Sequence, residues 1–351
     1  MRSLLVFFLL ALWSASGQKL YFPGTGDWER VQPQRAGWSA DGLDALLQFA
    51  ESRRSTGVVI LLHGRILTEQ YWEPTRFRAT MQYRFERSSD GQLREDVASM
   101  QKSVTSMLFG IARAKKLMDF DTPVSKLLGD GWSKLSPQQE GAITMRHLLT
   151  MTSGTTDELG FEAEPGAQWR YNTPAYQKIL PALAKAAGKD SNALTREWLA
   201  GPLGMRHSEW RTRPNMAGMV GFVTTARDMA RFGLMVLAGG GWEGKQIVDA
   251  NYVQEALRPS QQRNPSYGLL WWLNGQPLRR PGSRGGGEML IPTAPKDLVA
   301  AQGALGRKVY VVKSLGLVAV RIGGNAQEKG EADFNAEFWR LLMAAAPKGK
   351  P

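Results

Sequence analysis

Apolar β-type segments near both ends of the chain are the feature that most restricts its fold. Residues 57–62 and 66–72 flank a His-Gly turn, and residues 308–312 and 317–321 flank a Ser-Leu-Gly turn. Each pair predicts an antiparallel hairpin. Helical patterns lie between the hairpins at 145–151, 174–187, 226–238 and 251–257, and another at 334–345 closes the chain. This order predicts an α/β (α+β) fold, with an antiparallel sheet built from both chain ends, flanked by helices, and a mainly helical lobe inserted between them.

The organisation along the 351 residues indicates one domain, because the sequence has neither an internal repeat nor a biased linker. We expect a sheet lobe over about 18–115 and 262–351, and a helical lobe over about 116–261. Residues 1–17 resemble a secretory signal, with Arg2, an apolar run of about ten residues and a small-residue cleavage site. A bilayer span needs about twenty apolar residues, so this run is too short to be a membrane span, and we expect no span elsewhere in the chain. The signal-like segment predicts an exported protein, periplasmic or secreted.

The charge balance is strongly basic, with 44 Lys and Arg against 32 Asp and Glu and a net charge of +12. The basic pairs lie far apart and have no interleaved aromatic residues that would stack on bases. We therefore expect no nucleic-acid partner. The chain has no cysteine, which excludes disulfides and a thiol nucleophile.

The three histidines do not stand in any pattern that carries chemistry. His63 follows a strand pattern, His147 lies in an apolar run, and His207 lies in a loop pattern. The sequence has no Gly-x-Ser-x-Gly elbow and no His-Glu-x-x-His pair. We predict structural roles for all three histidines, and no metal site.

A Ser-x-x-Lys motif, Ser99-Met-Gln-Lys102, opens the helical pattern at 97–117. Three residues make about one helical turn, so the hydroxyl and the amine share a face. Burial disfavours the ammonium form, and a neutral lysine can take the proton of a serine nucleophile. The backbone N–H of Ser99, near a helix start, can bind an oxyanion. The alternative is a capping Ser99 beside a solvated Lys102, and the same spacing recurs by chance at Ser16 and Lys19.

Further segments follow this motif in a characteristic order: SMQKSVTS at 99–106, LLTMTSG at 148–154, WRYNT at 169–173, PLGM at 202–205, TTARD at 224–228, ARFG at 230–233 and YGLLWW at 267–272. Together they resemble the β-lactamase-like, penicillin-recognising serine hydrolases over nearly the whole mature chain. In detail they look most like the branch of 6-aminohexanoate-dimer hydrolases and family VIII esterases. The resemblance implies a single β-lactamase-like catalytic domain over 18–351 with the β-lactamase/transpeptidase-like fold.

The second motif of that family is Tyr-x-Asn, and it is matched here by Tyr171-Asn172-Thr173. The resemblance implies that Tyr171 faces the serine and lysine, protonates the leaving group and later helps to deprotonate water. Thr173 stands where the penicillin-active members usually have Asn, and it is a possible substrate contact. The alternative is that Tyr171 is a packed aromatic between Trp169 and Pro174.

The third motif is normally Lys-Thr-Gly on the strand that edges the site, and its best counterpart here is Ala301-Gln302-Gly303-Ala304. Gly303 would allow close approach of the substrate, the N–H of Ala304 would complete the oxyanion hole with that of Ser99, and Gln302 is a possible substrate contact. Ala301 replaces a lysine that would bind the carboxylate of penicillins, which is adverse to efficient β-lactamase action. The alternative is that Gly303 and Gly306 are an ordinary pair of strand glycines.

These observations predict an exported serine hydrolase that cleaves an ester or amide bond through an acyl-enzyme on Ser99, with Lys102 and Tyr171 as its proton carriers. No cofactor is expected, because these groups cover nucleophile, proton transfer and oxyanion. The expected partner is a small-molecule or peptide-like ester or amide substrate, with the oligomeric state left open. The alternatives are a β-lactamase or D-Ala-D-Ala carboxypeptidase, and a catalytically silent ligand-binding member of the fold.

Overall fold

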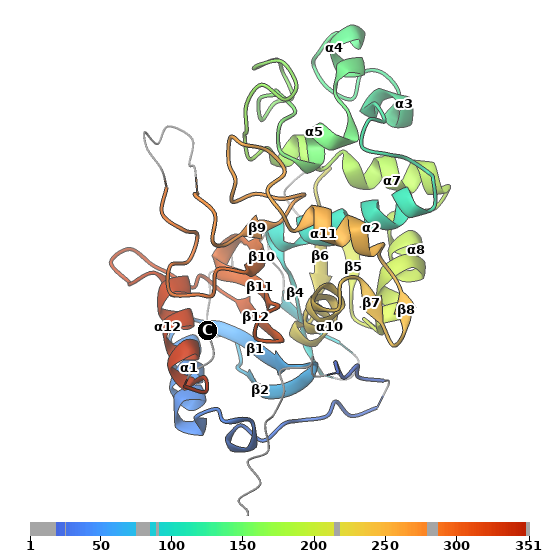
Figure 1. Cartoon of the computed structure of the whole chain (residues 1–351). Coiled ribbons are helices and arrows are strands. Elements are labelled where there is room, and N and C mark those ends of the chain that lie inside the picture. Colours follow the sequence, from blue (N-terminus) through green and yellow to red (C-terminus); the bar gives the residue numbers. More distant parts are fainter. Residues whose placement is uncertain are drawn as a thin grey trace, which may run out of the picture.

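A six-stranded antiparallel sheet joins the two ends of the chain in the computed structural model (Figure 1), in the order β2-β1-β12-β11-β10-β9. The structure describes residues 19–24, 26–74, 85–88, 91–213, 218–278 and 287–348, so the expected signal segment at 1–17 lies outside the described residues. The strands of this sheet are β1 (Ser55–Leu62), β2 (Arg65–Tyr71), β9 (Trp272–Leu273), β10 (Leu298–Gly303), β11 (Arg307–Val312) and β12 (Leu317–Gly323). Because β1 pairs with β12, the prediction of a sheet built from both chain ends is confirmed.

Helices cover both faces of this sheet, as the apolar run of β1 requires. All of β1 is buried, and alternate side chains of a strand point to opposite faces. Val58 and Ile60 belong to the core beneath α1 (Ala40–Ser52) and α12 (Phe334–Ala345), whereas their neighbours on β1 point into the larger core on the other side. The sheet thus lies between two hydrophobic layers (Figure 1).

Helix α10 (Ala226–Leu237) packs directly on the sheet, although its residues fall within the range expected for the helical lobe. Its first turn is capped by the Thr225 side chain, which accepts a hydrogen bond from the Asp228 N–H. Gly233 permits the close approach, because a Cβ at this position would lie 2.6 Å from a methyl carbon of Val318. The helical layer on this face is therefore formed partly by α10.

Helix α2 (Gln101–Ala114) runs through the larger core, and its residues from Gln101 to Ala112 are all buried. The pattern at 174–187 predicted one helix, but the structure has two, since the turn at Gln177 separates α6 from α7. The remaining helices are α3 (Val124–Leu128), α4 (Pro137–Ala142), α5 (Met145–Leu149), α6 (Thr173–Tyr176), α7 (Ile179–Ala187), α8 (Ser191–Thr195), α9 (Gly201–Leu203) and α11 (Ala250–Ala256).

Two smaller sheets complete the fold. The first has the strand order β3-β4-β6-β5, and β7 and β8 form a two-stranded hairpin. These strands are β3 (Phe85–Arg87), β4 (Leu93–Asp96), β5 (Glu209–Thr212), β6 (Val220–Thr224), β7 (Gly241–Trp242) and β8 (Lys245–Gln246). Strand β4 leads straight into the turn that carries Ser99, so the smaller sheet sets the position of that residue.

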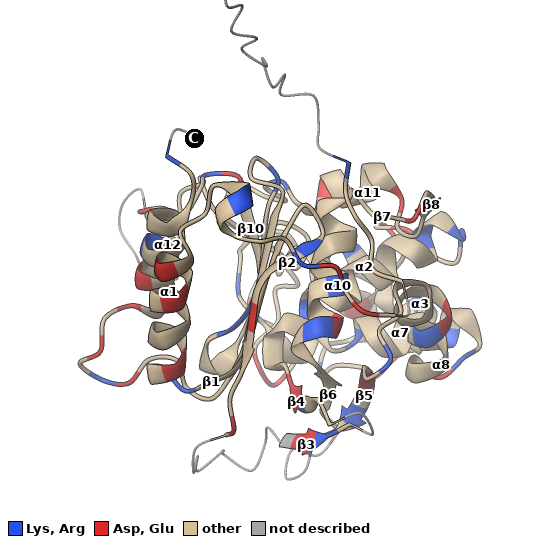
Figure 2. Cartoon of the chain, turned by 90° about the horizontal axis from the view of Figure 1, so that it is seen from below, with Lys and Arg blue, Asp and Glu red and all other residues tan. Residues whose placement is uncertain are grey.

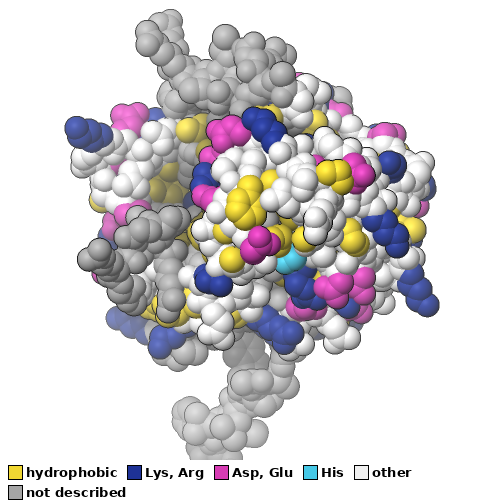
Figure 3. Space-filling view, turned by 90° about the horizontal axis from the view of Figure 1, so that it is seen from above, with side chains coloured by type: hydrophobic (Ala, Val, Ile, Leu, Met, Phe, Trp, Pro, Cys, Tyr) yellow, Lys and Arg dark blue, Asp and Glu magenta, His cyan; other side chains and the backbone are white. Residues whose placement is uncertain are grey.

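The charged residues are spread over the molecule. In Figure 2, both basic and acidic residues lie around α1 and α12 and around β3 to β5. The face shown in Figure 3 carries hydrophobic side chains in small separate patches among the charged ones. None of the helices in the described part of the chain is both long enough and apolar enough to cross a membrane.

Candidate active site

The half-buried Ser99 lies in a 3₁₀ turn (Ala98–Met100) between β4 and α2, rather than inside the long helix expected over 97–117. Ala98 has a φ of 52°, a left-handed conformation that costs a residue with a Cβ roughly 1–2 kcal/mol. Its N–H donates to Oδ1 of Asp96 over 2.7 Å, so a buried carboxylate holds this strained residue in place. The backbone just before Ser99 is thus fixed by a side chain two residues upstream of Ala98.

Two consecutive acidic residues anchor the turn to different parts of the fold. Asp96 forms a bidentate pair with Arg213, with Nε–Oδ2 and Nη2–Oδ1 distances of 2.7 and 2.9 Å. Gly221 makes room for this carboxylate, because a Cβ there would lie 1.8 Å from Oδ2. Glu95 accepts from Nε of Arg307 on β11 over 2.8 Å, and both of these side chains are fully buried. These pairs, which the motif analysis did not find, connect the Ser99 turn to both sheets.

Lys102 contacts the serine directly. Its Nζ lies 3.0 Å from Oγ of Ser99 and 3.1 Å from Oγ1 of Thr173. Burial, together with the positive charge of Arg213, lowers the pKa of Lys102 from 10.5 to about 7. A substantial share of Lys102 is therefore neutral near pH 7, which is the form that can accept the proton of Ser99.

Tyr171 also lies beside the amine, with Nζ of Lys102 4.8 Å from the centre of its ring. Burial raises the pKa of Tyr171 to about 12, although a hydrogen bond with Ser99 works in the opposite direction. The phenol therefore keeps its proton at neutral pH. Its ring is stacked on Trp272, with centroids 5.8 Å apart, so the orientation of the hydroxyl is fixed by packing.

The two residues after Tyr171 have different roles. The side chain of Asn172 caps α6 by accepting from the Ala175 N–H over 2.9 Å, and it donates to the carbonyl of Thr155 over 2.7 Å. Thr173, expected as a possible substrate contact, instead has its hydroxyl 3.1 Å from the amine of Lys102. The sequence pattern placed Thr173 near the site but did not identify Lys102 as its partner.

The end of β10 lies against the Ser99 turn. A Cβ on Gly303 would lie 2.3 Å from the carbonyl oxygen of Val97 and 3.3 Å from the backbone nitrogen of Met100. Only a glycine lets the strand come this close. The exposed Ala304 follows directly, so its backbone reaches the edge of the strand beside the nucleophile.

The other two third-motif residues do not present a polar side chain to Ser99. Ala301 is fully buried in the larger core. Gln302, the expected substrate contact, accepts a hydrogen bond from Nζ of Lys308 over 2.7 Å. By the alternation along β10, Gln302 shares its face with Ala300, which packs in the core beneath α1 and α12. Its side chain therefore points away from the nucleophile.

The histidines occupy structural positions rather than forming a cluster with acidic residues in the described part of the chain. Nδ1 of His147 accepts from the Thr144 N–H over 3.1 Å at the start of α5, which is a capping role. His63 lies in the turn between β1 and β2 with a φ of 49°. Across the described ranges, no three His, Asp or Glu side chains are grouped so as to hold a metal ion.

The antiparallel sheet, the helices on both its faces and the position of Ser99 ahead of a buried helix define a β-lactamase/transpeptidase-like protein. The beta-lactamase family model matches residues 43–342, so the chain belongs to this family, whose members are generally hydrolytic serine enzymes. No curated protein matches the chain.

Solved structures share the fold at low sequence identity. A candidate β-lactamase from Bacteroides dorei is 19% identical, with a TM-score of 0.68 over 88% of this chain and 99% of that chain. A candidate 6-aminohexanoate-dimer hydrolase from Bacillus anthracis is 15% identical, with a TM-score of 0.64 over 91% and 86%. EstCE1, a hydrolase with promiscuous acyltransferase activity, is 14% identical, with a TM-score of 0.58 over 86% and 99%.

Proposed function

We propose that the protein is a serine hydrolase that cleaves an ester or amide through an acyl-enzyme on Ser99. The observation that carries this proposal is the 3.0 Å contact between Oγ of Ser99 and the amine of Lys102, whose pKa is lowered to about 7. In the first step neutral Lys102 takes the proton of Ser99, and Oγ attacks the carbonyl carbon. The N–H groups of Ser99 and Ala304 would stabilise the oxyanion that forms.

The two proton carriers have pKa values shifted in opposite directions, which suggests separate roles. Tyr171, with its pKa raised to about 12, is the acid that protonates the departing alkoxide or amine. Lys102, with its pKa lowered to about 7, is the base. Lys102 then passes the proton it took from Ser99 to the Tyr171 phenolate, which restores both groups. In the second step water attacks the acyl carbonyl, Lys102 accepts a proton of the water and returns it to Oγ of Ser99 as the acyl C–O bond breaks, so that the carboxylic acid is released and free Ser99 returns.

An unconstrained ester or amide fits this site better than a β-lactam. The position of the family's third-motif lysine is held by the fully buried Ala301, which offers no cation for a substrate carboxylate. The hydroxyl of Thr173 is occupied by Lys102, so it does not replace the amide that the penicillin-active members have there. We therefore expect p-nitrophenyl esters to be hydrolysed faster than nitrocefin or a D-Ala-D-Ala peptide.

The test is a comparison of wild type, Ser99→Ala and Ser103→Ala, using ester turnover and intact mass after a fluorophosphonate probe. Ser103 is the matched control, because its hydroxyl on the same helix donates to the carbonyl of Leu270, whereas the amine of Lys102 bonds to Ser99 and Thr173. Wild type and Ser103→Ala should be labelled once, and Ser99→Ala should be neither labelled nor active. Unchanged turnover in Ser99→Ala would refute the assignment, and an unlabelled wild type would favour a catalytically silent binding protein.

We also propose that the chain is exported, on the strength of the signal-like segment at 1–17. Expression of the full-length sequence in a bacterial host should give a mature protein that begins at Gln18 in the periplasm or medium. N-terminal sequencing of the purified protein would show this. A product that retains residues 1–17 and stays in the cytoplasm would contradict export.

A further inference from the structure

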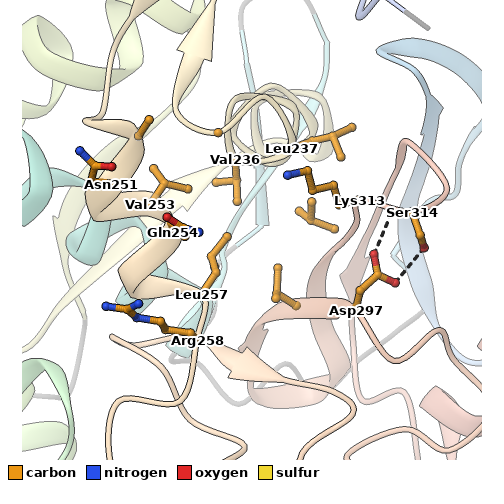
Figure 4. A pocket seen from close by; sticks show the side chains of 14 residues that line it. Val236, Leu237, Asn251, Val253, Gln254, Leu257, Arg258, Asp297, Lys313 and Ser314 are labelled. Atoms are coloured by element: carbon orange, nitrogen blue, oxygen red, sulfur yellow. Dashed lines mark hydrogen bonds between the residues drawn. The ribbon is translucent and has the colours of Figure 1, made fainter. Parts of the chain in front are cut away.

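A cavity of about 750 Å³ lies between α10, α11 and the sheet (Figure 4). It is lined by residues along α11 and just after it, by the end of α10, and by residues near the start of β10 and the end of β11. Ser99 lies at the other end of β10, where Gly303 meets the 3₁₀ turn. Five residue steps along the strand, from Leu298 to Gly303, span roughly 17 Å, so this cavity is separate from the candidate active site. Its volume falls in the range of small-molecule sites.

The apolar part of the lining is entirely aliphatic, and comes from Val236, Leu237, Val253, Leu257, Val299 and Val311. Four of these residues are at most 9% exposed, so they form a fixed floor that a ligand would cover. No aromatic ring lines the cavity, so nothing there would stack on a planar ligand. These walls suit a flexible alkyl chain.

The rim carries an excess of positive charge. Arg258, two residues after α11, and Lys313, just after β11, lie on opposite sides of the opening (Figure 4). Neither has an ion-pair partner within 4.0 Å among the residues that the structure describes. The one lining carboxylate, Asp297, is held at the edge by the backbone N–H and hydroxyl of Ser314, at 2.7 and 2.8 Å.

We propose that this cavity binds an amphiphilic carboxylate, a fatty-acid-like molecule with an unbranched alkyl chain and one anionic head. The chain covers the aliphatic floor, and the head lies near Lys313 or Arg258. Two cations that lack ion-pair partners, above a floor without polar groups, favour this ligand over a neutral or cationic one of the same length. The proposal does not depend on the chemistry at Ser99.

The test is isothermal titration calorimetry of the full mature protein with dodecanoate below its critical micelle concentration. Dodecyltrimethylammonium, with the same chain and the opposite charge, and acetate, with the head alone, are the ligand controls. We expect dodecanoate to bind with one site per chain and the other two not to bind. Each methylene removed from the chain should weaken binding by up to roughly fourfold.

Variants locate the site. Lys313→Gln and Arg258→Gln should each weaken the binding of dodecanoate by roughly two- to fivefold. The effect is modest because both cations are exposed to solvent, which screens their charges. Gln254→Trp, which fills the opening from an exposed position on α11, should abolish binding. Lys185→Gln, an exposed lysine on α7 removed from the cavity, is the control of equal charge change and should bind as wild type does.

Three outcomes would overturn the proposal. The first is that dodecanoate does not bind. The second is that Gln254→Trp leaves dodecanoate binding unchanged, which would place the bound alkyl chain elsewhere, for example at Ser99. The third is a dimer in solution that Gln254→Trp dissociates, because a second copy of this chain would then occupy the cavity. Thermal unfolding of each variant shows that the substitutions have left the fold intact.

Discussion

Replacing Lys102 with Met should abolish activity and yet stabilise the protein below neutral pH. Met has a similar length and no charge, so it can occupy the same buried space. Lys102 is only 2% exposed, and its pKa is about 7 in the folded chain against 10.5 ordinarily. At pH values between these two pKa values, Lys102 carries a proton in the unfolded chain but not in the folded chain. The contribution of Lys102 to the stability of the wild type therefore rises with pH from about 7 to about 10.5, and the cost of burying the amine reaches its full value below pH 7.

The size of the effect follows from the two pKa values. The cost of the buried amine is about 5 kcal/mol at pH 6 and about 2 kcal/mol at pH 9. Against this, the variant loses the contacts of Nζ with Ser99 and Thr173, each worth about 1 kcal/mol at any pH. Lys102→Met should therefore gain about 3 kcal/mol at pH 6 and close to nothing at pH 9.

Urea unfolding at several pH values between 6 and 9, followed by far-UV circular dichroism, measures this difference. The other titrating groups cancel when the variant is compared with wild type at each pH. Lys185→Met, at an exposed lysine on α7, serves as the control and should show no dependence on pH. A Lys102→Met gain that is equal at pH 6 and pH 9, or larger at pH 9, would refute the lowered pKa and with it the role of Lys102 as a base.

Three further predictions concern the proposed chemistry and the anchoring of the nucleophile. The rate of acylation of the wild type should rise with pH through about 7, because only neutral Lys102 accepts the serine proton; a flat profile in stopped-flow ester assays would contradict this. Tyr171→Phe keeps the stacking on Trp272 but loses the acid, so turnover should fall roughly 10²- to 10⁴-fold, and more for amides than for p-nitrophenyl esters, whose leaving group needs no proton. Equal losses for both substrates would argue against Tyr171 as the acid. Asp96→Asn should destabilise the fold by about 3–5 kcal/mol in urea unfolding, since it removes the carboxylate that neutralises the charge of the buried Arg213. It should also move the pH profile of acylation to lower pH, because the charge of Arg213, no longer neutralised by Asp96, would lower the pKa of Lys102 further. An unchanged profile would show that Arg213 does not influence the pKa of Lys102.

Local patterns were enough to predict the sheet and the long helix. The hairpins at 57–72 and 308–321 were evident because continuous apolar β-type runs are bounded by turn residues, and β1, β2, β11 and β12 lie there. The motif order also indicated that Ser99, Lys102 and Tyr171 would meet, and the structure places them within one site. Their catalytic roles remain predictions.

Other parts of the site depend on contacts that no local pattern encodes. The pattern at 97–117 did not show that Ser99 lies in a 3₁₀ turn, because the turn exists through the bond between Asp96 and the Ala98 N–H. The partner of Thr173 is 71 residues away in sequence. Gln302 has the right position in the motif, but the alternation of β10 directs its side chain toward Lys308. Each outcome was decided by the tertiary structure.

The acidic pair before the nucleophile explains how an unfavourable local structure persists. A left-handed Ala98 and a buried amine both destabilise the region around Ser99, so something nearby must hold it. Successive residues of β4 point to opposite faces, and for this reason Glu95 and Asp96 reach different partners. Glu95 reaches Arg307 beside the strand that ends at Gly303, and Asp96 reaches Arg213 beyond β5. The turn is thus fixed from the large sheet and from the small one at once, which places the Ser99 backbone between its base and the proposed oxyanion donor of Ala304.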